Sequence, residues 1–425
     1  MVHFQTGMIG VTARITVKEG GEPRNDSRVA HKLFRIDGAR SREGFSSEKL
    51  PVAEADIAKA GNANVNARCA TSTTGPTAAT IEAALVVSHE YSTLFPTMTG
   101  NKHKALIDYL RVLFTAVNTI LRNTETDILD LKLIILDIVI LTPYTEILDQ
   151  KYEKKPNLIE ASSPDALFKF MTANEHLFGG VDLVYYLSRH NYAMTFEGGY
   201  HEVRGMAYAG SACGDFAGAL VSDDATTMKG MTTIAHETLH ALGSEHDGAP
   251  ALDYIPNSPG ATACPDNKQY IMTATPSHEL LPLSPCTRDQ VVVYLKTEQA
   301  TCLKNAERRR SPPLSEANLR KPIINASRYC YNLHKDAVTV EHVRFHSDEY
   351  NIEKCILVCA TTNSEGEKEN NIYTAPDYMK CSETQNLVCI RGICGEIPSR
   401  PKPPHEGGVE VAKARLKLRS AVHKK

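Results

Sequence analysis

Apolar positions along the chain follow two spacings, which separate predicted helices from predicted strands. In residues 103–122, "HKALIDYLRVLFTAVNTILR", they recur every three or four residues, as on one face of an amphipathic helix. Residues 128–141, "ILDLKLIILDIVIL", are almost continuously apolar and predict a buried strand. Because Asp130, Lys132 and Asp137 interrupt this run of fourteen residues, it does not indicate a membrane-spanning helix.

The remaining elements alternate between the two types. Strands are predicted at 81–95 and 182–188, and a helix begins in "SSPDALFKFM", with Ser163 as its N-cap and Pro164 as its first residue. Residues 205–222, "GMAYAGSACGDFAGALVS", predict an edge strand that binds an extended peptide by main-chain pairing. This alternation predicts an α/β sheet flanked by helices.

Composition adds the compartment and excludes some partners. The 47 basic and 50 acidic residues leave a net charge of −3, which argues neither for nor against nucleic acid, and we expect no nucleic-acid partner. No stretch approaches eighteen uninterrupted apolar residues, so no membrane span is expected. Eleven cysteines fit an oxidising, secretory compartment. The first residues lack the features of a signal peptide, so we expect either that the true start is missing from this sequence or that the gene model is wrong.

The stretch "HETLHALGSEHD", residues 236–247, carries the clearest chemistry. On a helix, His236 and His240 lie four residues apart on one face and can reach one ion. Gly243 can adopt the left-handed conformation that ends the helix, so that His246 returns as a third ligand. Three imidazoles and one open position are typical of a catalytic zinc site. Glu237 then lies where it can take a proton from water.

Two interpretations of this stretch compete. HExxH alone is short, and a helix with solvated histidines explains it nearly as well. The full HExxHxxGxxH pattern is far less expected by accident and favours a zinc hydrolase.

The pattern HExxHxxGxxH followed by a methionine, Met272 in "QYIMTATPS", resembles the metzincin proteases. Asp247 after the third histidine resembles the reprolysin (adamalysin) branch. His246 and Met272 are 26 positions apart, and this long connection is most similar to secreted metalloproteases of tick saliva. The resemblance covers residues 80 to 305. It implies a metzincin-type domain with a mixed, mostly parallel sheet, zinc in its cleft and Met272 beneath the histidines, followed by a small disulfide-rich domain.

With this resemblance, composition divides the chain into five parts. Residues 1–76 are interpreted as a partial propeptide and linker, with one strand-like fragment, "VAHKLFRIDG". Residues 77–306 form the protease domain, and the charged, proline-bearing residues 307–328 form a linker with "RRR" as a candidate processing site. Residues 329–397 form the cysteine-rich domain, and residues 398–425 a basic, disordered tail.

The cysteines support this division. The resemblance to reprolysins implies the disulfides Cys213–Cys302 and Cys264–Cys286, whereas the six cysteines of the cysteine-rich domain allow fifteen connectivities. Cys69 precedes the protease domain. It is either a cysteine switch, whose thiolate occupies the open position of zinc in the precursor, or an unpaired linker cysteine.

Reprolysins often carry a calcium ion, and the resemblance points to Glu82, Asp182 and Asn305 as its ligands here. All three offer the hard oxygen atoms that calcium requires. Because no tight spacing connects them, three ordinary surface residues are an equal alternative.

The expected function is that of a secreted, monomeric zinc endopeptidase. The resemblance implies extracellular host substrates, such as matrix proteins or the clotting protein fibrinogen. Two rivals remain: a secreted anti-haemostatic protein that binds through its cysteine-rich domain, and a membrane sheddase, which the lack of a spanning helix disfavours. The basic tail is either a solvated terminus or an anchor for glycosaminoglycan.

Overall fold

The computed structural model describes residues 7–9, 13–17, 31–35, 77–97, 102–122, 128–267, 270–274, 281–304 and 314–397. The chain forms two compact units that divide between Ile323 and Ile324. Near the N-terminus, β1 (Gly7–Ile9), β2 (Ala13–Val17) and β3 (His31–Arg35) form an antiparallel sheet in that order. Among the described residues, no helix combines the length and apolar character needed to cross a bilayer.

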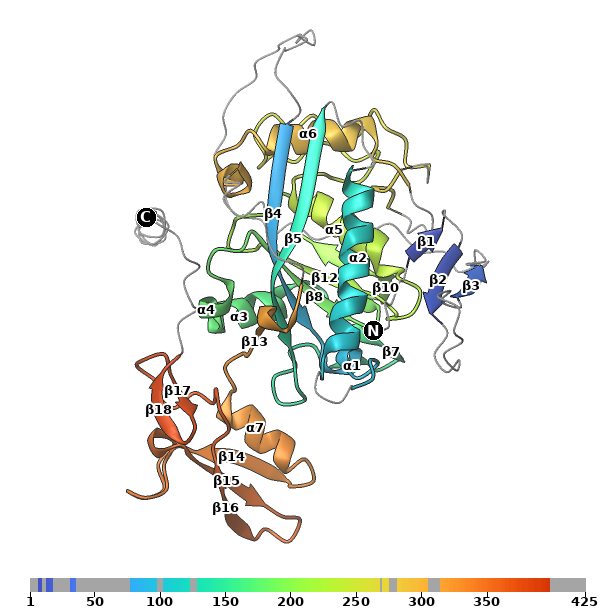
Figure 1. The fold of residues 1–425 in the computed structure, drawn as a ribbon. Coiled ribbons are helices and arrows are strands. Elements are labelled where there is room, and N and C mark those ends of the chain that lie inside the picture. The colour runs from blue at the N-terminus through green and yellow to red at the C-terminus, as the bar shows by residue number, and fades with distance from the viewer. Residues whose placement is uncertain are drawn as a thin grey trace. The chain divides into compact units, whose positions relative to one another are not determined.

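A six-stranded sheet forms the centre of the first unit (Figure 1). Its strand order is β11-β12-β8-β4-β5-β13, and every pair is parallel except β11 with β12. The strands are β4 (Thr77–Val87), β5 (Leu129–Ile140), β8 (Leu183–Ser188), β11 (Gly205–Ala207), β12 (Gly218–Ser222) and β13 (Leu319–Arg320). The predicted mixed, mostly parallel sheet is confirmed.

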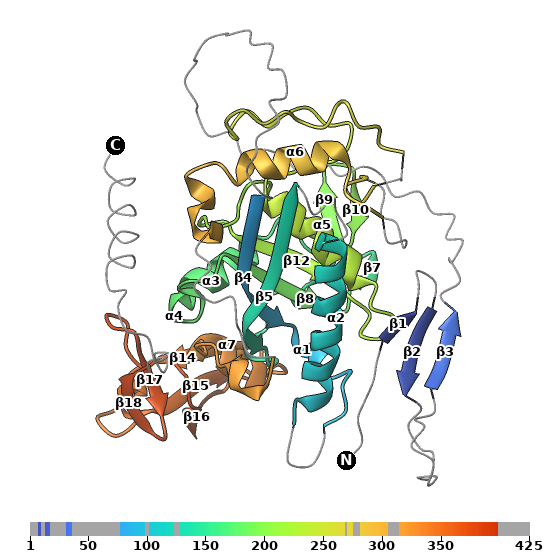
Figure 2. The same cartoon turned by 45° about the horizontal axis from the view of Figure 1, so that its top comes forward.

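Helices cover both faces of this sheet. The side chains of Ile81, Leu85 and Val87 on β4 belong to the core shared with α2 (Lys104–Arg122) and α5 (Gly230–Ala241). Ala84 and Val86 belong to a second core with α3 (Asp165–Ala173) and α4 (Glu175–Phe178). Successive strand residues point to opposite faces, so one strand contributes to both cores. In both views α2 runs beside β5 (Figures 1 and 2).

The other elements of the first unit connect and extend these layers. A second sheet has the order β10-β9-β7-β6. Its strands are β6 (Lys151–Tyr152), β7 (Lys155–Glu160), β9 (Tyr192–Phe196) and β10 (Gly199–Val203). The remaining helices are α1 (His89–Ser92), α6 (Pro285–Tyr294) and the 3-10 turns η1 (Gln299–Lys304) and η3 (Glu316–Asn318).

Three local predictions differ from the structure. Helix α3 begins at Asp165, and its N-cap is Pro164 rather than Ser163, because Pro164 has a ψ of 10° and is not yet helical. The predicted strand 81–95 ends at Val87, after which Ser88 caps α1. The predicted single edge strand 205–222 is two antiparallel strands, and only β11 lies at the edge. The chain reverses between them at Gly210 and Cys213, which both have positive φ.

Part of the expected linker, residues 307–328, is structured against the first unit. Leu314 is buried, and β13 pairs in parallel with the end of β5. The side chain of Asn318 donates to the carbonyl of Leu136 at 2.8 Å. The guanidinium of Arg320 lies 3.0 Å from the carboxylate of Asp137, which is 1% exposed. Asp137, which interrupts the apolar run of β5, is therefore paired with Arg320. Arg320 lies beyond residues 77–306, the predicted bounds of the protease domain.

The second unit is small and held by disulfides. It consists of α7 (Ala326–Leu333), β14 (Thr339–Val343), η4 (Ile352–Lys354), β15 (Ile356–Thr362), β16 (Lys368–Thr374), β17 (Leu387–Ile390) and β18 (Ile393–Glu396). Its disulfides are Cys330–Cys359, Cys355–Cys389 and Cys381–Cys394, one of the fifteen arrangements left open by the sequence. Five of these six cysteines are buried in its core, where they replace the larger apolar core of a bigger domain.

We expect the Asn118→Ala variant to be less stable than the native protein by about 1–3 kcal/mol, because it leaves buried backbone groups without partners. The side-chain amide of Asn118 on α2 donates to the Leu133 carbonyl at 2.8 Å and accepts from the Leu133 amide at 2.8 Å. It thereby satisfies β5 at a position that β13 does not reach. Chemical denaturation measures the loss. Thr119→Ala, at the exposed neighbouring position, is the control, and equal destabilisation by the two variants would contradict this role.

Candidate metal centre

Helix α5 carries three of the predicted site residues, and a buried carboxylate fixes where it begins. Asp223 is 3% exposed, and its Oδ1 accepts from the amide of Gly230, the first helical residue, at 2.8 Å. Its Oδ2 accepts from the hydroxyls of Tyr91 and Tyr109 at 2.7 Å each. A Cβ on Gly230 would lie 2.5 Å from the Cβ of Asp223, so glycine is required at this approach. The sequence analysis did not identify this anchor.

Gly243 ends the helix and turns the chain back toward it. Its φ is +89°, in the left-handed region, and its amide donates to the carbonyl of His240 at 2.8 Å. A Cβ here would lie 2.8 Å from the Cβ of Tyr294 on α6. The turn therefore needs glycine both for its conformation and for its close packing, and it returns His246 to the helix.

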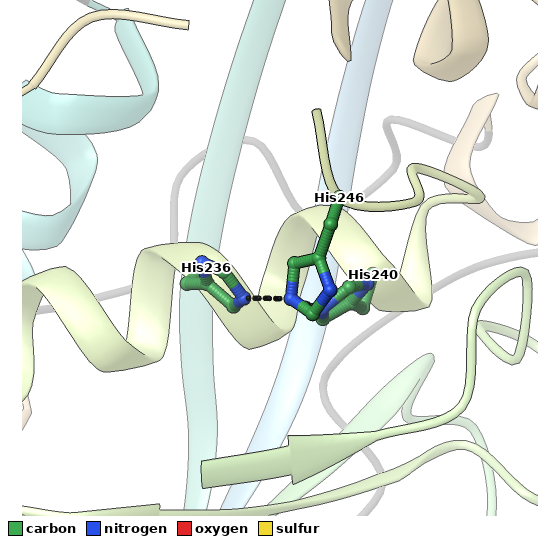
Figure 3. Close-up of side chains that lie close together, drawn as sticks. All are labelled: His236, His240 and His246. Atoms are coloured by element: carbon green, nitrogen blue, oxygen red, sulfur yellow. Dashed lines mark hydrogen bonds between the residues drawn. The ribbon is translucent and has the colours of Figure 1, made fainter. Parts of the chain in front are cut away.

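The three histidine rings converge, two from α5 and one from the segment after it (Figure 3). The Nε2 atom of His246 lies 3.1 Å from Nε2 of His236 and 3.2 Å from Nε2 of His240. Nδ1 of His236 lies 2.8 Å from the carbonyl oxygen of Ile271, and Nδ1 of His240 lies 2.7 Å from that of Ser244. Carbonyls only accept, so each Nδ1 carries the hydrogen and leaves a lone pair on Nε2.

Burial keeps these imidazoles uncharged. Desolvation lowers the pKa of His236 and lowers that of His240 further, and it lowers the pKa of His246 to about 3. The neutral form is the one that binds a metal ion.

The donor set fits zinc. Nitrogens bound tetrahedrally at about 2.0–2.1 Å from one ion lie about 3.3 Å from one another, close to the separations found here. Among the described residues, the group of donor atoms at this point consists of these three histidines. A site with three protein ligands leaves a position for substrate or water, which distinguishes catalytic from structural zinc sites.

Glu237 follows His236 on α5 and packs against the edge strand β11. Its side chain is 3% exposed. A Cβ on Gly205 of β11 would lie 2.5 Å from Oε1 of Glu237 and 2.8 Å from its Cγ. The absence of a side chain at Gly205 therefore makes the space that the Glu237 carboxylate occupies. The sequence pattern alone did not reveal this contact.

Met272 and Asp247 hold the loops behind the histidines. Met272 is fully buried, and its carbonyl accepts from the amide of Asp247 at 2.9 Å. Oδ1 of Asp247 accepts from the hydroxyl of Ser284 at 2.6 Å, and Ser284 is the N-cap of α6. Burial raises the pKa of Asp247. Asp247 thus connects the third histidine to the Met272 turn and to α6.

Both disulfides implied for the protease domain are present. Cys213–Cys302 connects the loop between β11 and β12 to η1. Cys264–Cys286 connects the segment between His246 and Met272 to α6.

The structure gives the calcium prediction no support. Oδ2 of Asp182 accepts from the amide of Glu82 at 2.9 Å, and the amide of Asp182 donates to the carbonyl of Glu82 at 2.6 Å. These contacts give the Asp182 carboxylate a structural role between β4 and β8. Asn305 lies outside the described residues, as do Cys69 and the basic tail.

We expect His240→Ala to lose bound zinc, because two imidazoles hold the ion far more weakly than three. The native protein should contain about one zinc per chain by elemental analysis, and the variant well under half of that. His176→Ala, which changes an exposed histidine on the same unit, should keep the native content. Full occupancy in His240→Ala would rule out this ligand set.

Comparison with known proteins agrees with this geometry. The model of the M12 metallopeptidase family, in its reprolysin group, matches residues 77–283. An antarease-like venom metalloproteinase of Tityus serrulatus is 30% identical over 210 residues, which are 47% of this chain and 88% of the relative. The venom metalloproteinase antarease of the same scorpion is 26% identical over 306 residues, 70% of this chain and 73% of the relative.

A more distant relative shares a shorter part. The human protein named a disintegrin and metalloproteinase with thrombospondin motifs 13 is 32% identical over 125 residues, 29% of this chain and 8% of that protein. The finer likeness to tick salivary enzymes stays a prediction. The converging histidines, the Met272 turn and these relatives together place the chain in the M12 reprolysin family, as a zinc metalloendopeptidase.

Proposed function

We propose that this enzyme hydrolyses peptide bonds in extracellular proteins and that Glu237 is its general base. The observation that carries the proposal is the position of Glu237, a buried carboxylate that follows His236 on α5 and packs against Gly205 of β11. His236, His240 and the Glu237 carboxylate belong to one helix, and the turn at Gly243 returns His246 to them.

The division of labour follows from the chemistry of each group. A zinc ion held by His236, His240 and His246 supplies a Lewis acid that polarises a carbonyl and acidifies water. Glu237 takes the proton of the attacking water and then passes it to the leaving amine. Because Gly205 has no side chain, the Glu237 carboxylate has room to contact first the attacking water and then the leaving amine.

The substrate binds along β11. Among the described residues this strand is the last of the sheet, so the side of its backbone away from β12 is where a substrate strand would be added. Main-chain pairing holds an extended peptide whatever its side chains are, and it lays the scissile bond beside Glu237. An endopeptidase needs this kind of binding, because it cuts within long chains.

We propose an extracellular location, which two observations support. The relatives described above include venom proteins. Five disulfides occur in the described part of the chain, as in secreted proteins. We therefore propose matrix or clotting proteins such as fibrinogen as the substrate class.

We expect Glu237→Gln to cut the turnover of a peptide substrate by about 10²–10⁴-fold while zinc stays bound, because the metal ligands are unchanged. Fibrinogen cleavage and zinc content are measured together, with and without chelator. Glu197→Gln, at an exposed glutamate, is the matched control and should behave as the native enzyme.

Near-native turnover in Glu237→Gln would assign the base to another residue. If native protein leaves fibrinogen intact yet still delays clotting, the binding function of the cysteine-rich unit would replace the proposed one.

A further inference from the structure

The backbone amides and carbonyls of β11 point alternately toward β12 and toward the side of the sheet away from β12. The amide of Ser222 donates to the carbonyl of Arg204 at 2.8 Å, and Met206 lies opposite Leu220 on β12. In an antiparallel pair every second residue directs both its amide and its carbonyl to the partner strand. Arg204 and Met206 therefore face β12, whereas Gly205 and Ala207, which are both buried, direct their backbone groups to the side away from β12. β11 ends at Ala207, and Ala209 lies two residues further on, in the turn that includes Gly210.

A side chain from another part of the chain contacts the backbone of Ala209. The hydroxyl of Tyr254 donates to the carbonyl of Ala209 at 3.2 Å. The ring is 47% exposed, so it lies at the surface, next to the edge. Tyr254 belongs to the segment between His246 and Met272, which are 26 positions apart.

The next residue, Ile255, packs this segment against the protein. Ile255 is 5% exposed, and its Cδ1 would lie 2.8 Å from a Cβ on Gly210, where φ is +68°. Glycine at position 210 thus lets Ile255 pack against the end of the edge strand. Tyr254 and Ile255 together hold the segment on Ala209 and Gly210.

The base of the segment is also fixed. The amide of Gly248 donates to the carbonyl of Ala261 at 2.9 Å, and the amide of Ala261 donates to the carbonyl of Ala249 at 2.8 Å. The disulfide Cys264–Cys286 follows at once. Tyr254 is therefore carried by a closed, cross-linked loop rather than by a loose one.

We propose that Tyr254 determines how far a substrate can pair with the enzyme on the amino side of the scissile bond. This inference rests on the proposed function, in which the substrate adds to β11. Antiparallel addition, the more stable arrangement, runs the substrate from Ala209 toward Gly205. Because Gly205 contacts Glu237, residues opposite Ala207 and Ala209 lie on the amino side of the cut. The Tyr254 hydroxyl takes the Ala209 carbonyl and ends the pairing there.

The test uses two series of peptides with one cleavage site, lengthened one residue at a time on the amino side or on the carboxyl side. In the native enzyme, kcat/KM should rise with amino-side length until the peptide covers Ala207 and then stay level. In Tyr254→Phe it should continue to rise, so that the ratio of the longest to the shortest peptide increases by about twofold to tenfold, the value of one hydrogen bond. Tyr254→Ala should increase the ratio at least as much.

The controls separate this inference from the function on which it rests. Tyr331→Phe, at an exposed tyrosine of the second unit, should keep the native ratio, and the carboxyl-side series should be the same in all variants. An unchanged or smaller ratio in both Tyr254 variants would overturn the role of Tyr254 while leaving the protease assignment intact. Absence of chelator-sensitive cleavage of every peptide by native enzyme would overturn the proposed function itself.

Discussion

Two main-chain carbonyls decide whether this protein has a metal centre at all. Those of Ile271 and Ser244 accept from Nδ1 of His236 and His240, and so hold the lone pairs of both rings toward His246. Imidazoles packed this closely cannot all be charged, and their burial keeps them neutral. The carbonyl of Ile271 is in place because Met272 is buried and bonded to Asp247. Residues 271–272, which lie far from α5 in the sequence, are thus part of the histidine site.

Elsewhere, buried carboxylates likewise connect segments that lie far apart in the sequence. Asp223 holds the start of α5, Asp247 holds the turn after His246, and Asp137 holds the strand β13. Each carboxylate accepts hydrogen bonds or an ion pair from a separate element. Each therefore fixes the position of two segments relative to one another, which apolar packing alone specifies less precisely. Asp223 thus fixes the start of the helix that carries Glu237, and Asp247 fixes the loop that carries His246.

The sequence predicted the elements whose signal is local. The spacing in residues 103–122 matches α2 to within one residue, and the apolar run at 128–141 matches β5 as closely. The zinc motif is local too, because its residues lie on one helix and one turn. Asp223 escaped prediction because its partners Tyr91 and Tyr109 are 132 and 114 residues away. The contact of Tyr254 with Ala209 escaped for the same reason, and so did the return of residues 319–320 to the central sheet.

The return of β13 to the sheet affects what a cut after the protease domain would do. Leu314, Asn318 and Arg320 are all held by the first unit, and the second unit continues directly from them. Cleavage at the arginines 308–310 would therefore break the chain without separating its two halves. The product would be a two-chain molecule whose cysteine-rich part stays attached through a strand, a buried leucine and an ion pair. Its release would need the sheet edge to open, as well as a broken peptide bond.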